Sequence, residues 1–129
     1  MKSGVILIAH GSRRSEATAE MLNLAHQVQE ANPFVIYEVA FMQFGSPDIK
    51  SAVSSLISQG VNRIVAVPLF LITGNHVTQD IPGELSSLKA AYPAVEFILA
   101  RHFAGHPALA QIIQDRISEA FLEGEAVGG

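Results

Sequence analysis

Short apolar runs alternate with amphipathic segments along this chain, and each apolar run ends in polar residues. Residues 4–9 form a continuous apolar run rich in β-branched side chains, and the polar turn His10-Gly-Ser-Arg-Arg14 follows it at once. Residues 15–31 carry apolar positions at helical spacing, with Ser15 as a candidate N-cap and Asn32-Pro33 as the stop. This stretch predicts a buried strand, a loop and a helix.

The same cycle repeats three times. We predict further strands over residues 34–41, 63–72 and 95–100, and further helices from Ser46-Pro-Asp48 to Gly60, over 82–91 and over 106–122. Strands that alternate with helices favour right-handed crossovers and a parallel sheet. The predicted class is therefore α/β, with one four-stranded parallel sheet and helices on both faces. A single domain over 1–129 is expected, with a frayed tail over about 124–129.

The loops that follow the strands are the predicted place for chemistry. Ligands of open parallel sheets bind beyond the carboxyl ends of the strands. The loops over 10–14, 42–47, 73–80 and 101–106 should therefore share one rim of the sheet.

Composition narrows the possible partners. The hydrophobic content is 49% and the charged content 16%, which indicates strands buried on both faces or a sizeable subunit interface. The net charge is −4 and no basic patch is present, so neither nucleic acid nor an anionic membrane surface is an expected partner. The first residues show neither a signal-peptide pattern nor an apolar run long enough to span a bilayer, which predicts a cytoplasmic protein.

Two histidines are the first candidates for a metal site. The chain has no cysteine, so a transition metal would need histidine, carboxylate or carbonyl ligands. His10 follows the first strand and His76 lies in the loop after the third, so both belong to the predicted rim although they are far apart in sequence. Two imidazoles with open remaining positions suit a divalent ion that is handed on. The alternative, that each histidine only caps or hydrogen-bonds its own loop, stays open.

The turn after His10 could also bind an anion. Gly11 permits close backbone approach, Ser12 follows it, and the next helix offers free N–H groups. Arg13 and Arg14 add positive charge, although adjacent arginines in a loop are often simply solvated.

Four other polar residues have ordinary structural explanations beside a functional one. His26 is predicted to be a surface residue of a helix. His102 and His106 lie in a rim loop, but a helix start at Gly-His-Pro accounts for His106. Asp80 is predicted to cap the third helix rather than to act on a substrate.

Three blocks of the sequence resemble a known family. They are Ala9-His-Gly-Ser-Arg13, Phe41-Met-Gln-Phe-Gly-Ser-Pro47 and the long stretch from Val67 through Gly-Asn-His-Val-Thr-Gln-Asp to Pro82, and Gly105-His-Pro107 adds to them. In order and spacing the chain resembles the short sirohydrochlorin cobaltochelatases and ferrochelatases, the CbiX/SirB-like members of the class II chelatases. The resemblance covers nearly the whole chain.

This resemblance implies an activity. It implies a lyase that inserts a divalent metal ion, Co²⁺ or possibly Fe²⁺ or Ni²⁺, into sirohydrochlorin without ATP, on the way to cobalamin or sirohaem. The metal ion is a substrate, and no organic cofactor is implied. His10 and His76 carry over as the catalytic, metal-binding pair. The predicted substrate-binding residues are Ser12, Arg13, Gln43, Phe70, Leu71, Ile72, Thr73, Gly74 and Asn75.

Gln43 departs from the family, whose members often have glutamate there. An amide can hydrogen-bond the substrate but cannot accept a proton at neutral pH. The acceptor of the pyrrole protons would then be His10, His76, Asp80 or a carboxylate of the substrate, and we favour His10 because the end of a strand is rigid.

The small size of the domain predicts a homodimer. A tetrapyrrole is wide and flat, and four strands offer an open rim rather than a cleft with two walls. A second copy would supply the other wall, as in the short members of the family.

Two other functions remain open. One is a phosphoryl-transfer enzyme that uses a phosphohistidine at His10. The other is a carrier of metal or tetrapyrrole that does not catalyse insertion.

Overall fold

A computed structural model of the chain describes residues 1–71, 74–124 and 126–128. Within these residues it has four strands, which are β1 (Ser3–Ala9), β2 (Ile36–Phe41), β3 (Arg63–Pro68) and β4 (Glu96–Leu99). The α-helices are α1 (Ser15–Ala31), α2 (Ile49–Ser58), α3 (Ile81–Ala91) and α4 (Pro107–Glu123), and a π-helix η1 (His76–Asp80) precedes α3. All strand pairs are parallel and the order is β2-β1-β3-β4. The predicted α/β class and four-stranded parallel sheet are confirmed.

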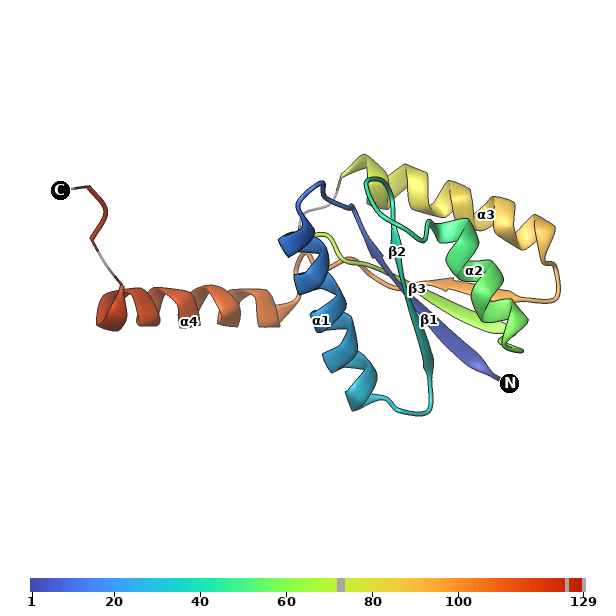
Figure 1. Cartoon of the computed structure of the whole chain (residues 1–129), viewed down its shortest axis with the longest axis horizontal. Helices are drawn as coiled ribbons and strands as arrows, with labels where there is room; N and C mark the ends of the chain where they lie inside the picture. Colours follow the sequence, from blue (N-terminus) through green and yellow to red (C-terminus); the bar gives the residue numbers. More distant parts are fainter. Residues whose placement is uncertain (72–73, 125, 129) are drawn as a thin grey trace.

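The main core lies between the sheet and helices α2 and α3, which cover the same face (Figure 1). Ile6 and Ile8 alternate along β1 toward this face and are completely buried. Their helical counterparts include Leu56 of α2 and Ile81 of α3, which are buried just as completely. This packing fixes the direction of β1 and therefore the position of the residue that follows it.

Helix α1 covers the opposite face. Leu7, Val39 and Phe41 form the buried cluster beneath it, together with Ala25 of the helix itself. Helix α1 packs mainly against β2. The prediction of helices on both faces is confirmed for α1, α2 and α3.

Helix α4 covers neither face of the sheet. It extends away from the strands and carries the C-terminal end of the chain outward (Figure 1). None of its residues, all of which the structure describes, is buried. The helices on the two faces of the sheet are therefore α1, α2 and α3, and α4 is an addition to that arrangement. Among the described residues, no helix has both the length and the apolar character needed to span a membrane.

Two predicted strands were too long. Strand β2 begins at Ile36, and Phe34 is 98% exposed. Strand β3 ends at Pro68, which has no N–H with which to extend the ladder, although Leu69 N–H still donates to the carbonyl of Ile8 at 2.8 Å. The end of the predicted strand, at Ile72, lies outside the described residues.

Several helix starts differ from the predictions. Ser15 is the first helical residue rather than the cap, and the Oγ of Ser12 accepts a hydrogen bond from the N–H of Arg14 instead. The cap of α2 is Asp48, whose carboxylate accepts from the N–H of Ser51 at 2.8 Å. These turns are closed by local side-chain bonds that apolar periodicity does not reveal.

The predicted loop before α3 is partly helical. Residues 76–80 form the π-helix η1, and Asp80 has helical dihedral angles and no side-chain capping bond. The predicted cap at Asp80 is therefore wrong, because the chain enters α3 from a preceding helical turn. The prediction for His106 is confirmed, since its Nδ1 accepts a hydrogen bond from the N–H of Ala108 at 3.0 Å.

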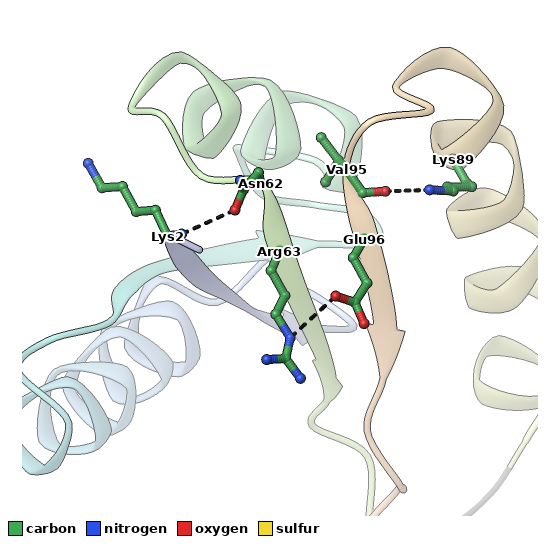
Figure 2. Close-up of polar contacts among 6 residues, drawn as sticks. All are labelled: Lys2, Asn62, Arg63, Lys89, Val95 and Glu96. Carbon is green, nitrogen blue, oxygen red and sulfur yellow. Dashed lines mark hydrogen bonds and ion pairs between the residues drawn. The ribbon is translucent and has the colours of Figure 1, made fainter.

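Polar contacts hold together the starts of the strands, at the end of the sheet opposite the predicted rim. The N–H of Lys2 donates to Asn62, and Arg63 forms an ion pair with Glu96 at 3.6 Å between β3 and β4 (Figure 2). The ammonium group of Lys89 in α3 donates to the carbonyl of Val95 at 2.8 Å. The rim at the other end of the strands is left for the candidate site.

Candidate functional site

His10 and Gln43 lie side by side at the carboxyl ends of β1 and β2. The hydrogen-bond ladder continues past both strands, because Met42 N–H donates to the carbonyl of Ala9 and Gln43 N–H donates to the carbonyl of His10. The side-chain nitrogen Nε2 of Gln43 is 2.5 Å from Nε2 of His10. An amide nitrogen can only donate, so with the amide in this orientation Nε2 of His10 is the acceptor.

An aromatic ring that follows another strand also contacts the imidazole of His10. Phe70 follows β3, and its ring centroid lies 6.3 Å from that of His10 at an interplanar angle of 75°. This is an edge-to-face contact of the kind that aromatic rings prefer. Residues that follow β1, β2 and β3 therefore meet at His10, as the topology predicted.

Gly11 permits this close approach. Its φ angle is 101°, and a Cβ at this position would lie 1.6 Å from the carbonyl oxygen of Gln43. Only glycine fits such a backbone against such a neighbour. The sequence indicated a close backbone approach here, and the group that approaches is the chain's own loop after β2.

Arg13 is held at the rim by a contact that the sequence did not predict. Its guanidinium carbon lies 4.5 Å from the centroid of the Phe44 ring, which is a cation–π contact. Phe44 has a φ angle of 53°, a left-handed conformation that turns the loop after β2 toward the loop after β1. Nothing in the pattern of the sequence predicts a left-handed phenylalanine, so this role of Phe44 was missed. Arg14 instead forms an exposed ion pair with Glu16 at 3.6 Å.

A small cavity lies beside His10, between the end of β1 and helix α1. Its volume is about 230 Å³, and its wall includes Ala17, Met21, Phe41 and Leu69. This is below the usual volume of a site that encloses a drug-sized molecule. A wide, flat ligand would therefore lie across the rim, with only an edge or substituent in the cavity.

The other predicted substrate residues lie in the segment after β3, which the structure describes only in part. Leu71 is 62% exposed, and Gly74 and Asn75 are exposed as well. The carbonyl of Gly74 accepts hydrogen bonds from the N–H and the hydroxyl of Thr78, both at 3.0 Å. The predicted residues Ile72 and Thr73 lie outside the described residues.

His76 is placed only by its backbone. It is the first residue of η1, and its side chain lies outside what the structure describes. The predicted pairing of His76 with His10 therefore stays a prediction. Among the side chains that the structure describes, no three from histidine, aspartate and glutamate cluster in a way that could hold a metal ion.

The remaining histidines have different surroundings. Nε2 of His26 lies 3.0 Å from a carboxylate oxygen of Glu30 on the surface of α1, which confirms its predicted surface position. His106 caps α4 and is exposed. His102 is partly buried in the loop after β4.

The fold and the rim define a class: a parallel α/β domain with a histidine held at the carboxyl ends of its central strands. Comparison with known proteins gives the family. The CbiX family model matches residues 4–120, and the chain belongs to this family.

Relatives of two lengths match this chain. The sirohydrochlorin cobaltochelatase of Methanopyrus kandleri is 32% identical, over 92% of this chain and 97% of that protein. The chloroplastic sirohydrochlorin ferrochelatase of Arabidopsis thaliana is 30% identical, over 95% of this chain and 56% of that protein. The chain spans only about half the length of several curated relatives that it matches.

Solved structures agree with the fold. The CbiX protein of cobalamin biosynthesis from Marinobacter aquaeolei VT8 superposes with a TM-score of 0.81 and 29% identity, over 93% of this chain and 98% of that one. The sirohydrochlorin chelatase SirB of Bacillus subtilis, in complex with cobalt, gives a TM-score of 0.87. That match covers 92% of this chain and 51% of the other at 24% identity, so it is evidence for the fold alone.

Proposed function

We propose that this chain is a lyase that inserts a divalent metal ion, Co²⁺ or else Fe²⁺ or Ni²⁺, into sirohydrochlorin without ATP. The observation that carries the proposal is the position of His10, held at the rim by Gln43 and Phe70. Membership of the CbiX family and relatives named as sirohydrochlorin chelatases support it. The metal ion enters as a substrate, and the proposal includes no organic cofactor.

His10 has the chemistry needed to deliver the ion. A neutral imidazole nitrogen binds borderline divalent cations, and a ligand set left incomplete by the protein leaves positions for the ring nitrogens of the substrate. The bond from Gln43 occupies Nε2 of His10, so the amide has to move away before this nitrogen binds a metal. We propose His76 as the second imidazole ligand, since its backbone lies in the segment after the neighbouring strand β3.

Metal insertion also removes two protons from pyrrole nitrogens. Gln43 cannot accept a proton at neutral pH, whereas a neutral His10 can. We therefore assign proton removal to His10, alone or together with His76. The protons then leave to solvent through the open rim.

The substrate would be held by its carboxylates and by its flat faces. Arg13, fixed over Phe44, presents a guanidinium that can grip a carboxylate, and Ser12 lies beside it. The segment from Phe70 to Asn75, including Leu71, Ile72, Thr73 and Gly74, is the proposed apolar and backbone surface for the macrocycle. This set of contacts follows the family resemblance.

We propose a homodimer as the working form, located in the cytoplasm. The small cavity beside His10 leaves a tetrapyrrole covered on one side only. Two relatives match nearly the whole of this chain with only about half of their own length, which leaves room in them for a second lobe. In this chain a second copy would supply that wall.

Absorbance-monitored insertion tests the proposal. The protein is incubated with sirohydrochlorin and Co²⁺, Fe²⁺ or Ni²⁺ in turn, and each rate is compared with the spontaneous rate. Acceleration over many turnovers supports a chelatase. Tight binding of metal or tetrapyrrole without acceleration would indicate a carrier. Hydrolysis of phosphate esters without acceleration would indicate the phosphohistidine alternative.

A further inference from the structure

Among the described residues, helix α4 carries an apolar stripe that is left largely exposed, and only its first turns share a hollow with Phe103. Its apolar residues recur at helical spacing on one side, and they are Leu109, Ile112, Ile113, Ile117 and Phe121. Ile112, Ile113 and Ile117 are each about half exposed, and Phe121 is 86% exposed. An isolated helix of 17 residues is marginal in water, so the stability of α4 requires a surface on which this stripe can pack.

The sheet has a matching uncovered strip on the face that α1 covers only in part. Val5, Val65 and Ile98 lie in one row across β1, β3 and β4, because Val65 pairs with both Val5 and Ile98. Val67 lies on the same face two residues further along β3. All four are only partly buried, and α1, which lies on this face, packs mainly against β2 at the edge of the sheet. Val5 and Val67 adjoin the cluster beneath α1, whereas Val65 and Ile98 belong to neither of the two described core clusters.

The charged residues around the strip favour a helix there. The ion pair of Arg63 and Glu96 lies on the same face, two residues before Val65 and Ile98, and so closes the strip at the starts of the strands (Figure 2). Toward the rim the strip stays apolar, with Val67 followed by Leu69. A strip that is apolar along its length and polar at one end suits an amphipathic helix lying along it.

The start of α4 directs the helix away from its own strip. The N–H of Ala100 still donates to the carbonyl of Ala66, so the chain follows β3 to the rim before it turns. Gly105, with a φ angle of 83°, and the cap formed by His106 then begin a helix that points outward (Figure 1). The helix and the strip are therefore separated within one chain.

We propose that α4 of one copy docks on the strip of a second copy, and that α4 of the second copy docks on the strip of the first. The dimer is then held together by exchanged helices. This inference rests on the homodimer proposed above and specifies its interface. A helix of 17 residues is about 26 Å long, and two reciprocal contacts of this size bury on the order of 1,200 Å², which is within the range of stable dimers. Because α4 begins at the rim, the exchange also brings the two rims toward each other.

Sedimentation of paired variants tests the exchange. The double variant Ile113→Asp with Ile117→Asp places two charges in the stripe, and Gln111→Asp with Ser118→Asp places two on the opposite side of the same helix. We expect wild type and the second variant to sediment at twice the chain mass of 13.8 kDa, and the first variant to sediment as a monomer. Since α4 has no buried residue, its substitutions leave the core intact.

The outcomes separate the exchange from the other proposals. A dimer that survives the Ile113→Asp and Ile117→Asp substitutions overturns the exchange and leaves the dimer itself standing. A wild-type chain that stays monomeric at all concentrations overturns both. The insertion rate of the wild-type protein is measured separately, so the chelatase activity is judged on its own result.

Cross-linking locates the contact directly, because the chain has no cysteine of its own. One copy carries Ile113→Cys or Ile117→Cys in α4, and the other carries Val65→Cys, Val67→Cys or Ile98→Cys in the strip. After mixing and oxidation we expect disulfide-linked dimers that contain one copy of each kind, and none when the strip cysteine is replaced by Ser54→Cys on exposed α2. Absence of these mixed disulfide-linked dimers for every pair of an α4 cysteine and a strip cysteine would overturn the exchange.

Discussion

The side-chain nitrogen of Gln43 lies 2.5 Å from Nε2 of His10, and the backbones of the same two residues share a hydrogen bond of 3.0 Å. The two contacts have different origins. The backbone bond extends the parallel ladder of β1 and β2 by one residue, and it places the amide where it can reach the ring. The amide then contacts Nε2 of the imidazole and fixes the orientation of the ring.

Gln43→Glu should change the pH dependence of metal binding. A carboxylate beside His10 favours the imidazolium and raises the pKa of the ring, and a protonated imidazole cannot bind a metal. Below neutral pH we expect Co²⁺ affinity to fall more steeply than in wild type, by roughly 3- to 10-fold at pH 6 for a rise of up to one pKa unit. Calorimetric titration between pH 6 and 8 measures this. Gln27→Glu, on the exposed side of α1, is the control. Parallel pH profiles for the Gln43 variant and wild type would refute the contact.

Gly11→Ala should destabilise the domain strongly. The added methyl would lie 1.6 Å from the carbonyl oxygen of Gln43, on a backbone whose φ is 101°. We expect a loss on the order of 3 kcal/mol or more in the free energy of unfolding, measured in urea. Gly83→Ala is the matched control, because its methyl enters open space in α3 and should stabilise by about 0.5–1 kcal/mol. Equal effects of the two substitutions would show that the loop after β2 does not pack on Gly11.

Asp48→Ala should destabilise α2 more where Asp48 is ionised than where it is protonated. Hydrogen bonds from Ser51 lower the pKa of Asp48 from its usual value of 3.8. A carboxyl whose folded pKa is lowered stabilises the fold above the unfolded pKa, and this stabilisation is lost as the pH falls through the folded pKa. We expect a cost of about 1 kcal/mol at pH 7 from loss of the cap, and a smaller cost at a pH well below 3.8, where the carboxyl is protonated. Urea unfolding at both pH values measures it. Asp48→Asn, which keeps an acceptor without charge, should cost less at pH 7, and a cost for Asp48→Ala that does not change with pH would contradict this account.

His10→Ala should weaken metal binding in the absence of tetrapyrrole. Loss of a residue that hydrogen-bonds a metal ligand lowers metal affinity by roughly 10-fold or more. Loss of a direct ligand should lower the affinity at least as much. Competition of Co²⁺ with a chromophoric chelator measures the constant. His26→Ala, which removes an exposed imidazole paired with Glu30, should leave it unchanged. Equal losses in both variants would mean that Co²⁺ binds histidines of the surface without preference.

The sequence predicted the rim because parallel topology alone determines it. Once strands alternate with helices, every loop after a strand lies at the same end of the sheet, and His10 comes directly after the most apolar of these strands. The contact between His10 and Phe70 follows from β1 and β3 being neighbours.

The details that periodicity could not predict depend on single atoms. Pro68 ends β3 because it lacks an N–H, although the apolar run continues beyond it. The capping bond at Asp48, the left-handed Phe44 and the hydrogen bond from Gln43 to His10 depend on loop conformations that leave no repeating pattern. Asp80 looked like a cap because its neighbours in sequence resemble a helix start, but η1 precedes it.

The position of α4 could not be predicted for a different reason. The helix does carry an apolar stripe, as its sequence indicates. The rule that such a stripe packs on the nearest face of the sheet holds only when the helix and the sheet belong to the same chain. Where the covering surface belongs to a second copy, the pattern of one sequence shows that a helix face is buried. It does not show which surface covers that face.

The rate of Co²⁺ insertion into sirohydrochlorin, compared between wild type, His10→Ala and His26→Ala, tests the central claim most directly. We predict that wild type and His26→Ala insert the ion at equal rates above the spontaneous reaction, and that His10→Ala is slower by on the order of 100-fold, because it loses both a metal ligand and a proton acceptor. A His10→Ala protein that inserts Co²⁺ as fast as wild type would contradict the account.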